Sequence, residues 1–206
     1  MSTSTVEVPQ GLDLNYLREE VKREYKKVAD DPNQGFHFHT GRRLAGIVNY
    51  RDEWLDAVPE EALASFAGTG NPFAMGEMRP GERVVDLGSG AGIDSFIAAH
   101  QVGEQGAVIG VDMTDEMLEK ASKAKEGKQL PQLEFKKGYL ENLPVDDDWA
   151  DVVIANGVIN LCPDKFGVFQ EIRRVLKPGG RIQIGDIMVN RPVSEKAKLN
   201  IDLWTG

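Results

Sequence analysis

A glycine-rich segment and an aspartate that follows it have the residue types and the spacing to hold a nucleotide. The segment reads Asp86-Leu87-Gly88-Ser89-Gly90-Ala91-Gly92, and Asp112 comes twenty residues after its last glycine. Glycine adopts the positive φ angles of a tight turn and lets a ligand approach the backbone closely. A carboxylate at the end of the next strand accepts hydrogen bonds from ribose hydroxyls. Together the two features predict one nucleotide-sized pocket.

The glycine spacing decides between two kinds of nucleotide ligand. The dinucleotide-binding pattern is G-x-G-x-x-G, whereas here the third glycine is Gly92 and Ile93 stands where that pattern has glycine. The observed spacing resembles the D-x-G-x-G-x-G loop of class I methyltransferases, which use S-adenosyl-L-methionine (SAM). The resemblance implies SAM as the cofactor. A nicotinamide-dependent oxidoreductase is the least favoured alternative. It assigns SAM binding to Asp86, Gly88, Ser89, Gly90, Gly92 and Asp112.

Within this pocket, Asp86 is expected to orient the loop or to contact the amino group of the methionine part of SAM. The helix expected over residues 93–102 begins directly after the loop. Its first N–H groups have no partner inside the helix, so they favour the carboxylate of a ligand.

A segment after the third expected strand resembles the adenine-binding segment of the family, G-D-x-x-x-L-P. It reads Gly138-Tyr139-Leu140-Glu141-Asn142-Leu143-Pro144, with Tyr139 at the usual aspartate position. The resemblance implies that the Glu141 side chain or the Leu140 backbone N–H contacts adenine, and that Met113 supplies an apolar wall. Tyr139 is interpreted equally well as an ordinary packing residue.

Longer segments resemble the arsenite methyltransferase group of this family. They are residues 108–118, 152–161 and 176–181, and the resemblance covers about half of the chain. Arsenite methylation uses thiolates as soft ligands for trivalent arsenic. The family cysteine expected after the fourth strand is absent, because Gly157 follows Asn156 there, and Cys162 is the only cysteine of the chain. A three-thiolate arsenic site therefore cannot be built from one copy.

We accordingly predict SAM-dependent methyl transfer to a small-molecule acceptor by a relative of the arsenite methyltransferases. Two alternatives stay open. One is a methyltransferase acting on a carbon atom of a quinone or sterol. The other is a module that binds SAM or S-adenosylhomocysteine and has lost its catalytic part.

Two histidines are the candidate catalytic residues. Methyl transfer is an in-line displacement that depends mainly on positioning, but a hydroxyl or carbon acceptor also needs a base. His37 and His39 are two residues apart, so they point the same way in an extended segment. They can also be packed or surface histidines, or part of a metal site with unidentified partners, and no metal ligand is assigned. Asn156 and Asn160 follow the fourth expected strand, where they can contact a ligand or cap the turn.

The composition limits the class of protein. The 206 residues include 24 Lys and Arg and 33 Asp and Glu, which give a formal net charge of −9. Because the basic residues are scattered among acids, we expect no nucleic-acid partner. The single cysteine suits the reducing cytoplasm. No apolar run reaches the roughly 18 residues of a membrane span, and the chain start has no signal-peptide core. These features predict a soluble cytoplasmic enzyme without a membrane partner.

The elements that must position these residues alternate regularly after residue 82. We expect strands over 83–87, 107–112, 133–137, 150–155 and 181–187, with helices over 93–102, 115–126 and 164–176 between them. This order predicts an α/β fold, a Rossmann-like doubly wound and mainly parallel sheet of about five strands flanked by helices. Residues 76–206 form the SAM-binding core, and residues 1–75 form a helical cap on the same compact domain.

The two ends of the chain carry further expectations. An amphipathic helix starts at Leu14, residues 36–41 form a strand or an ordered loop, residues 51–66 are helical, and Ser194 caps one more helix. The antiparallel hairpin that usually follows the fifth strand of class I methyltransferases is missing. The strand over 181–187 is then an open edge, which proteins normally cover. We expect a fragment, or an edge covered by the amino-terminal segment or by a second subunit in a homodimer.

Overall fold

The computed structural model describes residues 8–32, 34–36 and 38–205, and a five-stranded parallel sheet lies at its centre. The strand order is β3-β2-β1-β4-β5, so the chain winds outward from β1 in both directions. This arrangement confirms the predicted α/β fold. The strands are β1 (Arg83–Leu87), β2 (Ala107–Asp112), β3 (Leu133–Lys137), β4 (Ala150–Asn156) and β5 (Leu176–Gly185).

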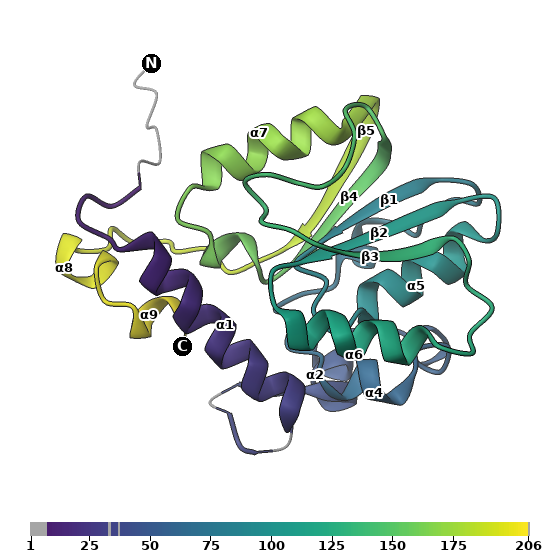
Figure 1. Ribbon diagram of the computed structural model, residues 1–206, viewed down its shortest axis with the longest axis horizontal. Coiled ribbons are helices and arrows are strands. Elements are labelled where there is room, and N and C mark those ends of the chain that lie inside the picture. Colours follow the sequence, from purple (N-terminus) through teal and green to yellow (C-terminus); the bar gives the residue numbers. More distant parts are fainter. Residues whose placement is uncertain (1–7, 33, 37, 206) are drawn as a thin grey trace.

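Helices cover both faces of the sheet (Figure 1). The helices α5 (Ile93–Val102) and α6 (Asp115–Lys125) pack on one face, and α7 (Lys165–Val175) packs on the other. The central strands β1 and β4 are buried along most of their length, because helices cover both faces of the sheet. Two buried hydrophobic clusters result, one on each side of the sheet.

The long helix α1 (Leu14–Asp30) lies across the end of the sheet at which the strands finish, beside α6 (Figure 1). It begins at Asp13, whose carboxylate accepts hydrogen bonds from the N–H groups of the first turn. Leu17, Val21 and Val28 form its buried stripe. The helix predicted from Leu14 is therefore present.

Short helices follow α1: α2 (Gly41–Ile47), α3 (Asp52–Leu55), α4 (Glu60–Ala64) and the 3-10 helix η1 (Pro72–Met75). The prediction of one helical stretch over 51–66 is wrong, because Pro59, which has no N–H group, stands between α3 and α4. Residues 38–40 and the described residues before them form a loop in which Phe36 stacks on Phe38 at 5.1 Å. The helix α2 was not expected.

The carboxyl-terminal elements also differ from expectation. Strand β5 begins at Leu176 rather than residue 181, since Leu176 pairs with Ala150 before a shift of register. Instead of one helix after Ser194, there are two single turns, α8 (Glu195–Lys198) and α9 (Asp202–Thr205). The Trp204 indole N–H of the second turn donates to the Lys198 carbonyl at the end of the first.

In the described part of the chain no antiparallel strand follows β5, whose outer side is the edge of the sheet. Among the described helices, none is both long enough and apolar enough to span a membrane.

Candidate functional site

A pocket of about 1050 Å³, including its part open to solvent, lies where the strands end. The loop between β1 and α5, the end of β2 and the start of α6 form its floor, and residues 138–141 form one wall. Residues 156–163, which include the 3-10 helix η2 (Ile159–Leu161), form another wall. Leu17, Arg18, Val21 and Tyr25 of α1 cover it.

The three glycines of the loop have different surroundings. All have positive φ angles, 63° at Gly88, 52° at Gly90 and 96° at Gly92. A Cβ on Gly92 would lie 2.7 Å from the Phe135 ring, and one on Gly88 would clash with Val158. A Cβ on Gly90 would meet only the Met117 sulfur, at 4.0 Å. Gly90 therefore keeps space free above the loop. Gly92 serves packing against β3 and is not among the described residues that line the pocket.

Asp112 lies at the end of β2 and is tied to the glycine loop. One carboxylate oxygen accepts from the Gly90 N–H at 2.9 Å, and the other accepts from the Thr114 N–H at 2.8 Å. The Thr114 side chain and the Met113 backbone also hydrogen-bond to this carboxylate. Burial raises the pKa of Asp112 above its ordinary value. The structure thus brings this carboxylate and the glycine loop together, with Met113 beside them in the pocket lining.

Asp86 and Ser89 are buried in the same floor. Asp86 accepts a hydrogen bond of 2.6 Å from the Ser95 hydroxyl. Burial and the neighbouring Asp94 raise the pKa of Asp86 well above its ordinary value. The Ser89 hydroxyl is buried and has no hydrogen-bond partner among the described residues. An unpaired buried hydroxyl in a pocket is suited to a ligand, because leaving it unpaired is unfavourable.

Asp94 and Tyr50 are site residues that the sequence analysis missed. The Tyr50 hydroxyl donates to one oxygen of Asp94 at 2.5 Å, and the Asn156 amide donates to the other at 3.0 Å. Burial raises the pKa of Asp94 to about 6. The one available signal was an acidic residue in the otherwise uncharged start of a helix, Ile93-Asp94-Ser95-Phe96.

Asn156 lies at the end of β4, as expected, but its side chain is bonded to the protein. Its amide oxygen accepts from the N–H groups of Thr69 and Gly70, both at 2.9 Å. Its amide nitrogen lies 3.0 Å from each of three acceptors, the Tyr50 hydroxyl, the Gly70 carbonyl and the Asp94 carboxylate, and shares its two N–H groups among them. Asn156 therefore holds the segment around residue 70 over the end of the sheet.

The wall expected to contact adenine meets α1. Leu140 and Glu141 line the pocket, and Glu141 accepts a hydrogen bond of 3.2 Å from Arg18. The Arg18 guanidinium also lies 4.9 Å from the centre of the Tyr139 ring, and Lys22 donates to the Tyr139 hydroxyl at 3.3 Å. Tyr139, at the usual aspartate position, is thus a contact for the covering helix.

The two histidine candidates are not brought to the pocket by the described structure. His39 is exposed and is not among the described residues that line the pocket, and His37 lies outside the described residues. Asn160 lies in η2, where its N–H donates to Asp186. Cys162 lines the pocket, and burial raises the pKa of its thiol to about 12, so it is protonated at neutral pH. No group of three potential metal-ligating side chains occurs among the residues that the structure describes.

Comparison with known proteins adds the following. The family described as a methyltransferase domain matches residues 78–205. An arsenite methyltransferase from Halobacterium salinarum is 48% identical over 139 residues, which are 68% of this chain and 36% of that protein. A demethylmenaquinone methyltransferase from Bacillus cereus is 34% identical over 106 residues, 52% of this chain and 45% of that protein.

Among solved structures, this fold is similar to that of an arsenic(III) S-adenosylmethionine methyltransferase from Chlamydomonas reinhardtii. The TM-score is 0.59 and the identity is 36%, over 75% of this chain and 51% of that one. The chain spans only 36% and 45% of the lengths of the two curated relatives above.

Proposed function

Because this chain belongs to the methyltransferase domain family, among members that use S-adenosylmethionine, we propose that it transfers the methyl group of SAM to a small-molecule acceptor. The observation that carries the proposal is the hydrogen bond from the Gly90 N–H to the Asp112 carboxylate in the floor of the pocket. A tight turn alone does not require a buried carboxylate at the end of the neighbouring strand.

The residues present fit SAM. The Asp112 carboxylate lies in the pocket lining, where it can accept from ribose hydroxyls. Gly90 leaves space above the loop, and the buried Ser89 hydroxyl has no partner among the described residues. According to the family resemblance, Leu140, Glu141 and Met113 would contact the adenine base. When bound, SAM supplies a methyl group on a positively charged sulfur, which makes that carbon electrophilic.

The remaining task of the protein is to hold an acceptor in line and to exclude water. Leu17 and Val21 of α1 cover the pocket, and Leu161 and Cys162 line the side nearest η2. This apolar wall suits a small acceptor whose reacting atom is held close to the methyl group in a closed site. Cys162 lies in this wall, and burial raises the pKa of its thiol to about 12, so the thiol is protonated at neutral pH.

Transfer to a heteroatom is the first candidate, as in the arsenite relatives. Transfer to carbon is the second, and the demethylmenaquinone relative together with the apolar wall favours it. That reaction needs a base to remove a proton. We propose His37 and His39 for that role.

The test is label transfer from methyl-labelled SAM, catalysed by the full chain. Arsenite, a demethylated quinone and a small-molecule metabolite extract are the acceptors. We expect a labelled small molecule whose formation is lost when the protein is heated, and the acceptor that takes the label separates the two candidates. If SAM binds but label never leaves it, a SAM-binding module is the correct function. Failure to bind SAM at millimolar concentration would contradict the proposal.

Three further expectations belong to this proposal. Residues 1–75 act as a cap on the core, which the α1 contacts at the pocket support. The enzyme works in the cytoplasm without a nucleic-acid or membrane partner, as the net charge of −9 and the single cysteine suggest. A second copy of the chain covers the outer edge of β5, where apolar side chains are exposed.

A further inference from the structure

Asp94 is a buried carboxylate of the pocket that the family resemblance does not assign. It is 4% exposed, lies in the first turn of α5 and lines the pocket. Each of its oxygens accepts one described side-chain hydrogen bond, from Tyr50 or from Asn156. These bonds fix the position of the carboxylate and leave acceptor positions for a ligand.

The pocket is lined by three buried carboxyl groups that have no cationic partner among the described residues. Asp86, Asp94 and Asp112 line it together, and the hydrogen bonds described for them come from uncharged hydroxyl, amide and backbone N–H groups. Arg18 is the one Lys or Arg among the described lining residues, and it is paired with Glu141. Buried carboxylates are normally paired or protonated. A ligand with positive charge would supply the missing partner.

The topology shows which end of such a ligand Asp94 would meet. Asp112 ends β2, whereas Asp94 is bonded to Asn156 at the end of β4, and β1 lies between these two strands. A ligand with its ribose at Asp112 therefore extends over the β1 loop toward Asp94. In SAM the amino-acid part lies at the end away from the nucleoside. The first turn of α5 also offers N–H groups to the carboxylate of that part.

We propose that Asp94 binds the ammonium group of the amino-acid part of the methyl donor, and that Tyr50 and Asn156 are positioning residues for it. The inference deepens the proposed function and rests on it. Asp86 was expected to orient the loop or to contact this group, and its described side-chain hydrogen bond comes from Ser95 within the same floor. Asp94 instead has partners on both sides that come from distant parts of the chain.

Tyr50 is built to hold its hydroxyl in place. Its ring packs edge-on against Phe66 at 5.3 Å and against Phe73 at 6.2 Å, and the residue is 6% exposed. Asn156 donates to the same hydroxyl that donates to Asp94. The three side chains thus form a closed triangle of hydrogen bonds. Removing the tyrosine hydroxyl would loosen Asp94 without changing any charge.

The experiment is calorimetric titration of the full chain with three ligands. SAM and S-adenosylhomocysteine carry the ammonium group, whereas 5′-deoxy-5′-methylthioadenosine is the nucleoside thioether without the amino-acid part. For Asp94→Asn we expect about tenfold to a hundredfold weaker binding of the first two ligands, because a charge-assisted hydrogen bond is lost. Binding of the third ligand should stay within about twofold. Tyr50→Phe should show the same selectivity with a smaller loss, of about threefold to tenfold.

The control is Tyr16→Phe, because Tyr16 is exposed on α1 and does not line the pocket. It should leave all three affinities unchanged. Equal weakening of all three ligands in Asp94→Asn and Tyr50→Phe would overturn the proposal, because it would mean a purely structural role. Unchanged affinity for SAM would overturn it too. Failure of the unaltered chain to bind SAM would instead refute the proposed function, so the two failures are distinguishable.

Discussion

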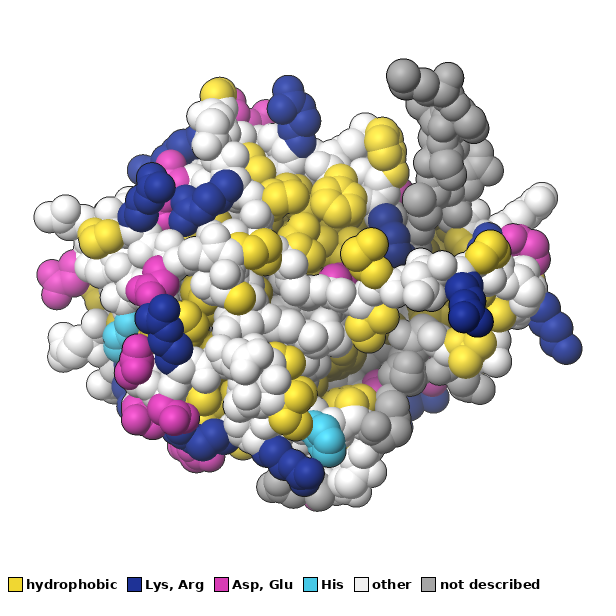
Figure 2. Space-filling view, turned by 180° about the vertical axis from the view of Figure 1, so that it is seen from behind, with side chains coloured by type: hydrophobic (Ala, Val, Ile, Leu, Met, Phe, Trp, Pro, Cys, Tyr) yellow, Lys and Arg dark blue, Asp and Glu magenta, His cyan; other side chains and the backbone are white. Residues whose placement is uncertain are grey.

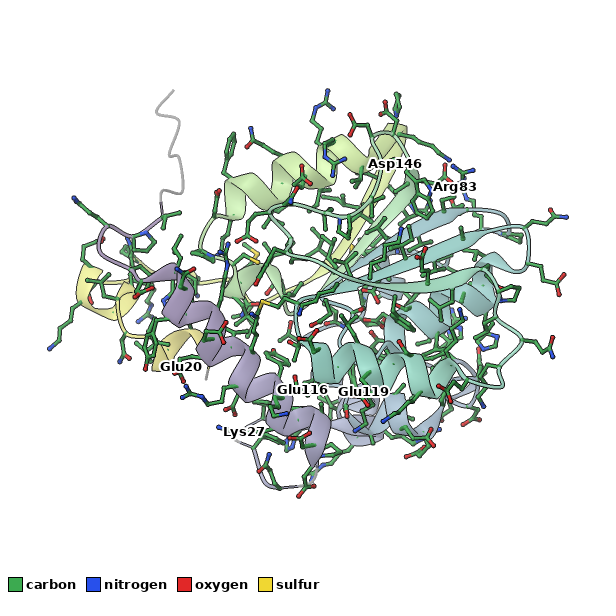
Figure 3. All side chains as sticks on the ribbon, in the orientation of Figure 1. Glu20, Lys27, Arg83, Glu116, Glu119 and Asp146 are labelled. Carbon is green, nitrogen blue, oxygen red and sulfur yellow. The ribbon has the colours of Figure 1, made fainter. Side chains whose placement is uncertain are left out.

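Asp112 accepts a hydrogen bond from the Gly90 N–H of the glycine loop, and it also lies in the lining of the pocket. Replacing it with alanine removes the hydrogen bonds to the ribose, so we expect SAM binding to weaken by about 1–3 kcal/mol. Calorimetry measures this change. Asp146→Ala is the matched control, because Asp146 is exposed at the end of the sheet away from the pocket (Figure 3). Unchanged affinity in Asp112→Ala would mean that the ribose lies elsewhere.

Gly90 and Gly92 should respond differently to the same substitution. Both have positive φ angles, but only at Gly92 would a Cβ meet a buried ring. We expect Gly92→Ala to lower the free energy of unfolding by about 1–3 kcal/mol more than Gly90→Ala does. We expect Gly90→Ala to have the larger effect on SAM affinity, because its methyl group would occupy ligand space. Thermal melting and calorimetry on both variants check the pair, and the reverse order of effects would contradict this account of the loop.

The buried carboxylates predict how stability depends on pH. Burial raises the pKa of Asp94 to about 6, whereas an aspartate in an unfolded chain titrates at about 3.9. Between these values the folded protein holds a proton that the unfolded chain has released. The contribution of Asp94 to stability is therefore present at low pH and is lost as the pH rises to about 6. Asp86 and Asp112, whose pKa values are also raised, act in the same direction.

Asp94→Asn removes this titration. Relative to the unaltered chain, the variant should gain about 2 kcal/mol of unfolding free energy between pH 4 and pH 7. Denaturant unfolding at several pH values measures the difference. Asp52→Asn, at a side chain that is 92% exposed, should show no such trend. If the difference in unfolding free energy between Asp94→Asn and the unaltered chain does not change with pH, the raised pKa does not belong to Asp94.

At the scale of elements, three basic side chains of α1, spaced four residues apart, contact the pocket wall and α6. Arg18 reaches Glu141 and the Tyr139 ring, Lys22 reaches the Tyr139 hydroxyl, and Lys26 pairs with Glu116 of α6. Figure 3 shows Glu116 at the end of α6 that faces α1. Tyr139 is therefore part of the contact between α1 and the pocket wall.

We expect the double variant Arg18→Ala/Lys22→Ala to release bound SAM about twofold to fivefold faster, because exposed ion pairs are weak singly. Stopped-flow displacement measures the rate, and added salt should reduce the difference from the unaltered chain. Lys27→Ala is the control, because Lys27 pairs with Glu24 of the same helix (Figure 3). Equal release rates in all three proteins would show that α1 does not limit exchange.

The elements also show what a sequence can predict. The sheet and its helices were expected within one or two residues, apart from the early start of β5, because strands buried on both faces are continuous apolar runs. The helices α2, α3 and α4 were missed or misplaced, because turns this short depend on tertiary packing. In the site, the glycine loop is local in sequence and was found. The hydrogen bond between Tyr50 and Asp94 joins residues 44 positions apart, so no local sequence pattern predicts it.

At the scale of the whole molecule, the outer edge of β5 is the surface that most needs a partner. Beside it, Phe169 of α7 and Ile182 of β5 are 44% and 45% exposed and line one groove. Figure 2 shows hydrophobic side chains gathered over this side of the molecule. An edge strand with such a face is a template for another strand. In an antiparallel pair of β5 strands, Lys177 near the start of one would lie toward Asp186 just after the end of the other.

We therefore expect Ile182→Lys to convert a dimer into a monomer. Sedimentation velocity of the unaltered chain should give about twice its mass of 22.7 kDa, and the variant should give that mass itself, since a charge on the edge opposes strand pairing. Ile47→Lys is the control, because Ile47 is 56% exposed on α2, away from β5. If the chain is monomeric without any substitution, a second copy does not cover this edge. If both lysine variants stay dimeric, the dimer forms through another surface.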